Sequence, residues 1–134
     1  MKISLLTTGG TIASVESDRG LQPGLAGEQL LRVCPGLMGF EHDVAVVDLM
    51  SKNSSNMHPS DWLVMADYVR DSAARYAIVM LHGTDTMAWT ASALSYLLND
   101  VPVPVVLTGS MLSADTPDSD VSSKIGRASC RERV

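Results

Sequence analysis

Residues 77–81 read Ala-Ile-Val-Met-Leu, an uninterrupted apolar run that ends at the polar turn His-Gly-Thr-Asp-Thr (82–86). A strand that is apolar on both faces is typical of a parallel sheet covered by helices on each side. A second short buried strand is predicted at residues 3–7, and it ends at the glycine turn Thr-Gly-Gly-Thr (8–11). Two such strands, each leading directly into a polar turn, favour an α/β protein.

Strands and helices alternate along the rest of the chain. Further strands are predicted at 43–49, which is β-branched and mostly apolar, and at 103–107. Helices are predicted at 28–33, at 59–73 and at 87–98, because apolar residues recur there at helical spacing. This alternation builds βαβ units, so we predict a parallel, flavodoxin- or Rossmann-like sheet with helices on both faces.

Bulk composition restricts the class of protein. The chain has 134 residues, 46% of them hydrophobic and 19% charged, which suits one globular domain. Its net charge of −5 argues against nucleic acid as the main partner, because phosphate binding uses clustered Lys and Arg. No apolar run approaches the roughly 20 residues of a membrane span, so no membrane partner is expected. The first strand is too short for the apolar core of a signal peptide, and we expect a cytoplasmic protein.

Cysteines and histidines give no recognisable pattern. Cys34 and Cys130 form neither a disulfide framework nor a metal motif. His42, His58 and His82 have no cysteine or acidic partner at ligand spacing, so no metal site is predicted. We expect His82, at the end of a buried strand, to be structural rather than catalytic.

The last eleven residues, 124–134, differ from the rest of the chain. They hold four of the ten basic residues, and without them the chain has six basic and fourteen acidic residues, a net charge of −8. Residues 125–134 also resemble the codon-for-codon translation of a common short-read sequencing adapter. We therefore predict a truncated native domain at 1–123 and a non-native tail at 124–134. The alternative is a natural basic tail that binds an acidic surface.

The glycine turn that follows the first strand is the first candidate site. Ligands of parallel sheets bind at the carboxyl ends of strands, and glycines let a substrate approach the backbone closely. A hydroxyl just beyond the turn, such as that of Thr11, is well placed to attack a carbonyl carbon. The alternatives are a purely structural turn or a weak phosphate cradle. Because the turn lacks both the Gly-x-Gly-x-x-Gly spacing and a P-loop lysine, the nucleotide interpretation is poor.

The turn at 82–86 is the second candidate. Thr84 or Asp85 is suited to cap the following helix, which is a structural interpretation. In the functional interpretation they place a hydroxyl beside a carboxylate at a helix start whose N–H groups stabilise an oxyanion. Asn-Ser-Ser-Asn (53–56) and Thr-Gly-Ser (108–110) follow two more strands. Four strands that end in small hydroxyl or glycine residues indicate a pocket for a small, polar, zwitterionic ligand.

Two segments carry a resemblance to a known family. Thr-Gly-Gly-Thr-Ile-Ala (8–13) and Leu-His-Gly-Thr-Asp-Thr-Met (81–87) resemble the signature segments of the bacterial-type L-asparaginase/glutaminase family. The similarity extends over residues 2 to about 120, and segments 54–57 and 88–94 look closer to cytosolic-type members. The resemblance implies the N-terminal domain of an asparaginase.

The resemblance also implies a reaction, the hydrolysis of asparagine or glutamine to the acid and ammonia through an acyl-enzyme. Thr11 is then the nucleophile, and Thr84 and Asp85 form a second catalytic pair in which Asp85 also holds the substrate's amino group. The family pattern implies no metal or organic cofactor and an intact protein that is a homodimer or homotetramer. The remaining substrate-binding positions that it implies are Gly10, Ser54, Ser55, Gly83 and, through its backbone, Ser110.

The chain departs from the family pattern in several places. A lysine completes the family's second catalytic set about seventy residues beyond Thr84, and this chain has none there. Leu21 occupies a position at which many members have a tyrosine, which leaves the proton acceptor for Thr11 unassigned. The family's C-terminal domain, which lends a carboxylate to a neighbour's site, is also missing. We therefore expect this chain to be an inactive fragment.

Two other functions stay open. The amidase subunit of a tRNA-dependent amidotransferase shares both signature segments, but it usually carries an extra N-terminal domain for which the strand at residue 3 leaves no room. A non-catalytic amino-acid-binding module would keep the pocket without the lysine.

Overall fold

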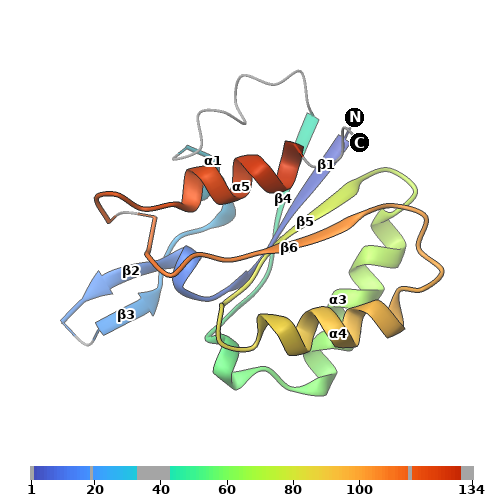
Figure 1. Cartoon of the computed structure of the whole chain (residues 1–134), viewed down its shortest axis with the longest axis horizontal. Helices are drawn as coiled ribbons and strands as arrows, with labels where there is room; N and C mark the ends of the chain where they lie inside the picture. Colours follow the sequence, from blue (N-terminus) through green and yellow to red (C-terminus); the bar gives the residue numbers. More distant parts are fainter. Residues whose placement is uncertain (1, 19, 33–42, 115, 131–134) are drawn as a thin grey trace.

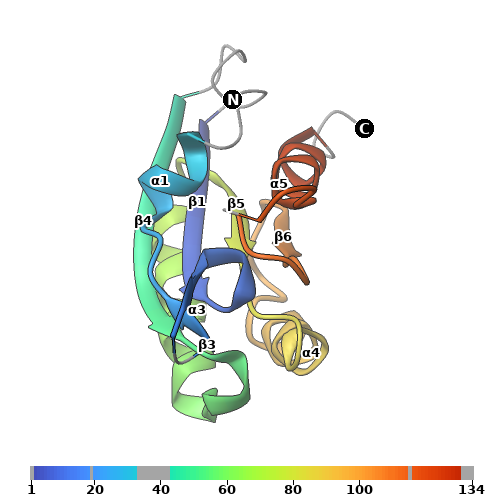
Figure 2. The same cartoon turned by 90° about the vertical axis from the view of Figure 1, so that its left-hand side faces the viewer.

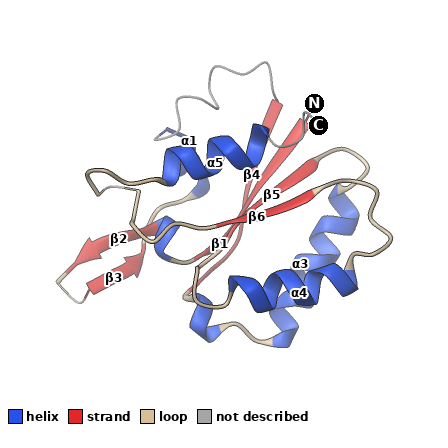
Figure 3. Ribbon diagram, in the orientation of Figure 1, coloured by secondary structure: helices blue, strands red, loops and turns tan. Residues whose placement is uncertain are grey.

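A computed structural model describes residues 2–18, 20–32, 43–114 and 116–130. Its main sheet has four strands in the order β4-β1-β5-β6, and every neighbouring pair is parallel. The strands are β1 (Lys2–Gly9), β4 (Asp43–Lys52), β5 (Ala77–Leu81) and β6 (Val105–Thr108). The helices are α1 (Gly27–Arg32), α3 (Pro59–Ser72), α4 (Met87–Leu97) and α5 (Val121–Cys130). The predicted parallel α/β fold is confirmed (Figures 1 and 3).

Helices cover both faces of the sheet, so the domain has three layers (Figure 2). Side chains of a strand alternate between its faces, which divides the core in two. On one face Ile3 and Leu5 of β1 pack with α1 and α5, and on the other Leu6 packs with α3 and α4. All five residues of β5 are buried, as its continuous apolar sequence predicted.

Prolines explain where the last strand of the sheet begins. The sequence predicted a strand at 103–107, whereas β6 begins at Val105. Pro102 and Pro104 have no N–H to donate to a neighbouring strand. Pro104 still contributes its carbonyl oxygen, which accepts the Ile78 N–H at 3.1 Å.

A small antiparallel hairpin was not predicted. It consists of β2 (Ser14–Ser17) and β3 (Gly20–Pro23) and projects from the sheet beside the turn that follows β1 (Figure 1). Gly20 closes it with φ = 87°, a left-handed conformation that glycine adopts without strain. Four residues per strand are too few for a clear alternation of polar and apolar side chains.

The C-terminal segment also differs from expectation, because α5 runs through the predicted boundary at 123/124. Val121, Ile125 and Ala128 are buried at helical spacing and pack against the sheet. The exposed residues between them include Lys124 and Arg127. The origin of residues 124–134 stays a prediction; Cys34, His42 and residues 131–134 lie outside the described residues.

Within the described ranges, no helix is long and apolar enough to cross a bilayer.

Candidate active site

Two glycine-containing turns meet at the carboxyl ends of β1 and β5. Gly10 has φ = 84°, and a Cβ atom added to it would lie 2.3 Å from the Gly83 Cα. The backbones of the two threonine motifs are therefore in direct contact, and only glycine at position 10 allows this. The Gly10 N–H donates to the Lys52 carbonyl at 3.0 Å, which ties the same turn to the end of β4.

The turn after β4 completes the site. It forms the short 3₁₀ helix η2 (Ser54–Asn56), which Asn53 caps by accepting the Ser55 N–H at 3.0 Å. A Cβ atom on Gly83 would lie 2.5 Å from the Ser54 Oγ, so this turn also packs directly on the second threonine motif. Three of the four predicted polar turns thus converge on one point.

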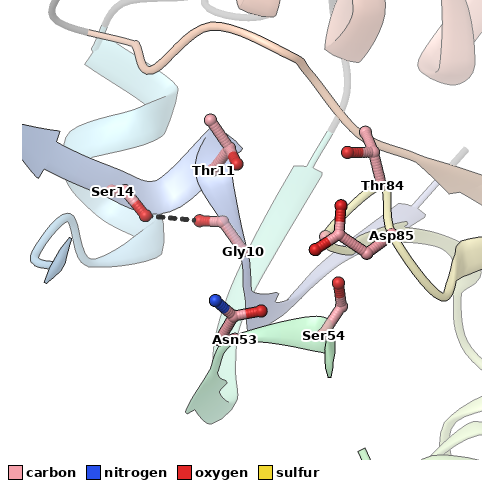
Figure 4. Close-up of a pocket in the computed structure, with 8 residues that line it drawn as sticks. Gly10, Thr11, Ser14, Asn53, Ser54, Thr84 and Asp85 are labelled. Atoms are coloured by element: carbon pink, nitrogen blue, oxygen red, sulfur yellow. Dashed lines mark hydrogen bonds between the residues drawn. The ribbon is translucent and has the colours of Figure 1, made fainter. Parts of the chain in front are cut away.

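The three turns enclose a cavity of about 140 Å³. This is well below the 300–1,000 Å³ typical of pockets for drug-sized ligands, so a molecule of amino-acid size fits better than a nucleotide. Figure 4 shows the hydroxyl groups of Thr11 and Thr84 and the carboxylate of Asp85 turned toward the same space. The residues that line it are Gly10, Thr11, Ser14, Asn53, Ser54, Gly83, Thr84 and Asp85.

Asp85 places a negative charge at the cavity. Its Oδ2 accepts the Ser55 hydroxyl at 2.9 Å, which links the second and third turns. In the part of the chain that the structure describes, Asp85 forms no ion pair. Its carboxylate is available for a cationic group such as an ammonium.

The helix-cap interpretation of Thr84 and Asp85 is wrong. Helix α4 begins at Met87, and its N-cap residue is Thr86. The Thr86 hydroxyl makes no capping bond and instead donates to the Ser54 carbonyl at 2.8 Å. Because the helix begins one residue later than a cap at Asp85 requires, and two later than a cap at Thr84 requires, both side chains are left to face the cavity.

Both threonine motifs that form the site lie in a segment that matches a known protein family. Residues 2–130 match the family model described as "Asparaginase, N-terminal". The chain belongs to the asparaginase family. The resemblance of the two threonine segments to this family is thereby confirmed.

Individual relatives agree with this assignment. The L-asparaginase of Thermococcus kodakarensis is 36% identical over 96% of this chain and 39% of its own length. Its solved structure superimposes with a TM-score of 0.82 over 91% of this chain and 38% of that one. A probable cytoplasmic L-asparaginase from Campylobacter jejuni gives a TM-score of 0.80 at 28% identity, over 95% of this chain and 40% of its own. A glutamyl-tRNA(Gln) amidotransferase subunit from Haloquadratum walsbyi is 45% identical over 88% of this chain and 27% of its own.

The chain thus spans about two fifths or less of the length of these relatives. The part that it spans lies in the asparaginase N-terminal domain. Side chains that a longer relative supplies from the rest of its length therefore have no counterpart in this chain.

Two predicted positions in this asparaginase domain lie outside the cavity lining. The buried Ser110 hydroxyl is paired with the Asp120 Oδ1 at 2.7 Å, although the preceding Gly109 packs against the His82 carbonyl. Ser55 reaches the site only through its bond to Asp85. Across the described ranges, no group of three or more His, Cys, Asp or Glu side chains is suited to hold a metal ion.

One lining residue, Ser14, was missed from the sequence. It follows Thr11 by three positions, because the 3₁₀ helix η1 (Thr11–Ala13) begins at Thr11 and ends directly before Ser14. Residues i and i+3 of a 3₁₀ turn lie on the same side, so recognising this turn would have placed Ser14 beside Thr11. Its hydroxyl donates to the Gly10 carbonyl at 2.9 Å, which supports the first turn from within (Figure 4).

Proposed function

We propose that this domain carries the amidohydrolase site of an L-asparaginase, which converts asparagine to aspartate and ammonia. The observation that carries the proposal is the convergence of Thr11, Thr84 and Asp85, from both threonine motifs, on one small cavity. A zwitterionic amino acid suits this site, since Asp85 complements its ammonium group. Ser54 and the backbone near Ser55 complement its carboxylate.

Thr11 is the proposed nucleophile. Its hydroxyl oxygen adds to the side-chain amide carbon of the substrate, and its proton is transferred to the departing ammonia. The backbone at Gly10 and Gly83 borders the space for the amide, where backbone N–H groups stabilise the oxyanion that forms. We expect the Ser110 backbone to face the amide from outside this lining. Water then hydrolyses the Thr11 ester and releases aspartate, so no metal or organic cofactor takes part.

No lysine of this chain is free to act as the base. The three lysines each pair with an aspartate, Lys2 with Asp43, Lys52 with Asp61 and Lys124 with Asp120. None of them lines the cavity. We therefore expect the 134-residue chain to bind the product aspartate but to release ammonia from asparagine far below enzymic rates. In the intact parent, a homodimer or homotetramer in the cytoplasm, the lysine and the neighbour's carboxylate complete the site.

Calorimetric titration with aspartate tests this proposal. Asp85→Asn should weaken binding at least about tenfold, because a charge-assisted hydrogen bond to the ammonium is lost. Asp67→Asn is the matched control, since Asp67 is a surface carboxylate paired with Arg70 away from the cavity. A folded chain that binds no aspartate would refute the site, and rapid ammonia release would refute the fragment hypothesis.

The second candidate is the amidase subunit of a tRNA-dependent amidotransferase. It is favoured by the 45% identity to the Haloquadratum walsbyi amidotransferase protein, which exceeds the 36% identity to the Thermococcus kodakarensis enzyme. Both candidates use the same cavity. Hydrolysis of free asparagine by the intact parent, without tRNA or a partner protein, separates them, because only the asparaginase hypothesis requires it.

A further inference from the structure

His82 lies directly behind the site but takes no part in lining it. It is fully buried, yet both of its ring nitrogens are hydrogen bonded. The Nδ1 atom lies 2.7 Å from the Gly83 carbonyl oxygen, and the Nε2 atom lies 3.0 Å from the Thr90 hydroxyl. Thr90 in turn accepts the Trp62 indole N–H at 3.0 Å.

The chemistry of each group fixes which atom donates in the hydrogen bonds that link Trp62, Thr90, His82 and Gly83. A carbonyl oxygen only accepts, so the proton of a neutral ring must sit on Nδ1 and point to Gly83. The Nε2 atom is then an acceptor and takes the single proton of the Thr90 hydroxyl. An indole N–H only donates, so Trp62 supplies the hydrogen bond that Thr90 accepts. Burial, the larger influence, lowers the pKa of His82, which agrees with a neutral ring.

This series of hydrogen bonds ends at the Gly83 carbonyl oxygen, which belongs to the peptide between Gly83 and Thr84. A trans peptide is planar, and its N–H points opposite to its carbonyl. With the Gly83 carbonyl held toward the buried ring, the Thr84 N–H points away from the ring. A flip of this peptide would reverse both groups.

Glycine at position 83 makes such a flip possible. Its lack of a Cβ is required, because a Cβ would lie 2.5 Å from the Ser54 Oγ. A flip of the Gly83–Thr84 peptide rotates ψ of Gly83 and φ of Thr84, and the same lack of a Cβ gives Gly83 a wider range of ψ. Close packing of the turns therefore depends on a residue that restrains this peptide only weakly, and the hydrogen bond from His82 adds a restraint.

We propose that His82 is a positioning residue: the hydrogen-bonded chain Trp62–Thr90–His82 holds the Gly83–Thr84 peptide in one orientation at the cavity. The chain links α3, α4 and the end of β5, so the second threonine turn is anchored to the packed core on both helices. The role of that turn rests on the proposed function, but the peptide orientation does not.

The test uses the full chain labelled for NMR, with paired substitutions at position 82. Asn places an amide N–H where Nδ1 stood and keeps the donor to Gly83, whereas Gln reaches the Nε2 position and loses that donor. In the unsubstituted protein we expect the Nδ1–H tautomer and one set of resonances for the Gly83 carbonyl and Thr84 amide. His82→Gln should give exchange broadening or a second set at these two groups, and His82→Asn should restore one set.

Thr90 supplies an independent pair if a position-82 variant does not fold. Thr90→Ser keeps the hydroxyl and should leave the ring ¹⁵N shifts unchanged, whereas Thr90→Val should shift the Nε2 resonance. An Nε2–H tautomer at neutral pH would overturn the proposal. So would unchanged Gly83 and Thr84 resonances in His82→Gln or Thr90→Val. None of these readouts needs a ligand, so failure to bind aspartate would count against the proposed function alone.

Discussion

Gly10 has to adopt a positive φ and also has to leave room for the backbone of Gly83. It has φ = 84°, and an added Cβ would lie 2.3 Å from Gly83 Cα. Gly10→Ala should therefore combine left-handed strain with overpacking, and we expect a loss of about 2–4 kcal/mol in the free energy of unfolding. Urea denaturation measures this loss, and calorimetry should show loss of aspartate binding.

Alanine substitutions at two other glycines separate the cost of left-handed strain from the cost of overpacking. Gly20 has φ = 87° and no atoms near its missing Cβ, so Gly20→Ala reports the strain alone. Gly126 has neither a positive φ nor a close neighbour, and in helix α5 Gly126→Ala should stabilise the chain by up to about 1 kcal/mol. Equal effects at Gly10 and Gly20 would show that contact with Gly83 is unimportant.

The sequence predicts site residues well where a single rule places them. Thr11, Thr84 and Asp85 each follow a strand that is identifiable from its apolar run, and parallel strands bring their carboxyl ends together. Thr86 could not be assigned in this way. Its hydroxyl bonds to Ser54, thirty-two positions earlier in the chain, and no local pattern reports such a contact.

At the scale of elements, the start of α3 is fixed to the end of β4 by Asp61. Its Oδ1 accepts the Lys52 ammonium at 2.7 Å and its Oδ2 accepts the His58 N–H at 2.9 Å. Asp61→Asn should lower the free energy of unfolding by about 1–2 kcal/mol, the usual value of such a capping interaction. Asp67→Asn, at a carboxylate that is 76% exposed, should change it by less than about 0.5 kcal/mol.

The stabilisation that the Asp61 carboxylate provides depends on pH. The hydrogen bond from Lys52, followed by that from the His58 N–H, lowers the pKa of Asp61 below 3.8. The unfolded chain thus takes up a proton first as the pH falls, so the stabilisation is complete above 3.8 and is lost below it. Urea denaturation should show the wild-type and Asp61→Asn curves converging as the pH falls below this value. Parallel stability profiles would contradict the assignment.

Elements were predictable where they bury an extended apolar pattern. Strand β5 and helix α3 do so: β5 has its predicted bounds, and α3 ends one residue before its predicted end. Among the α5 side chains that the structure describes, three are buried between polar ones, and the hairpin β2–β3 has four residues in each strand. Their formation depends on neighbours that are distant in sequence, so local pattern alone was insufficient.

At the scale of the whole molecule, one side of the sheet leaves apolar surface uncovered. In the described ranges β6 pairs only with β5, so its other edge is free. Beside this edge lies a groove of about 520 Å³, lined almost wholly by apolar residues of α4, β6 and the segment between them. On α4, Trp89 and Tyr96 are 64% and 82% exposed. An open edge beside apolar surface favours pairing between chains.

We therefore expect the chain to self-associate with rising concentration, as sedimentation velocity would show. Val103→Lys should reduce this association, since Val103 lines the groove two residues before β6 begins and a lysine at a sheet edge opposes pairing. Leu63→Lys is the matched control, because Leu63 is 53% exposed on α3 and does not line the groove. If both variants reduce association equally, general hydrophobicity is the cause rather than the edge. A monomer that melts cooperatively at every concentration would contradict the prediction, because the apolar groove would then be tolerated in water without a partner.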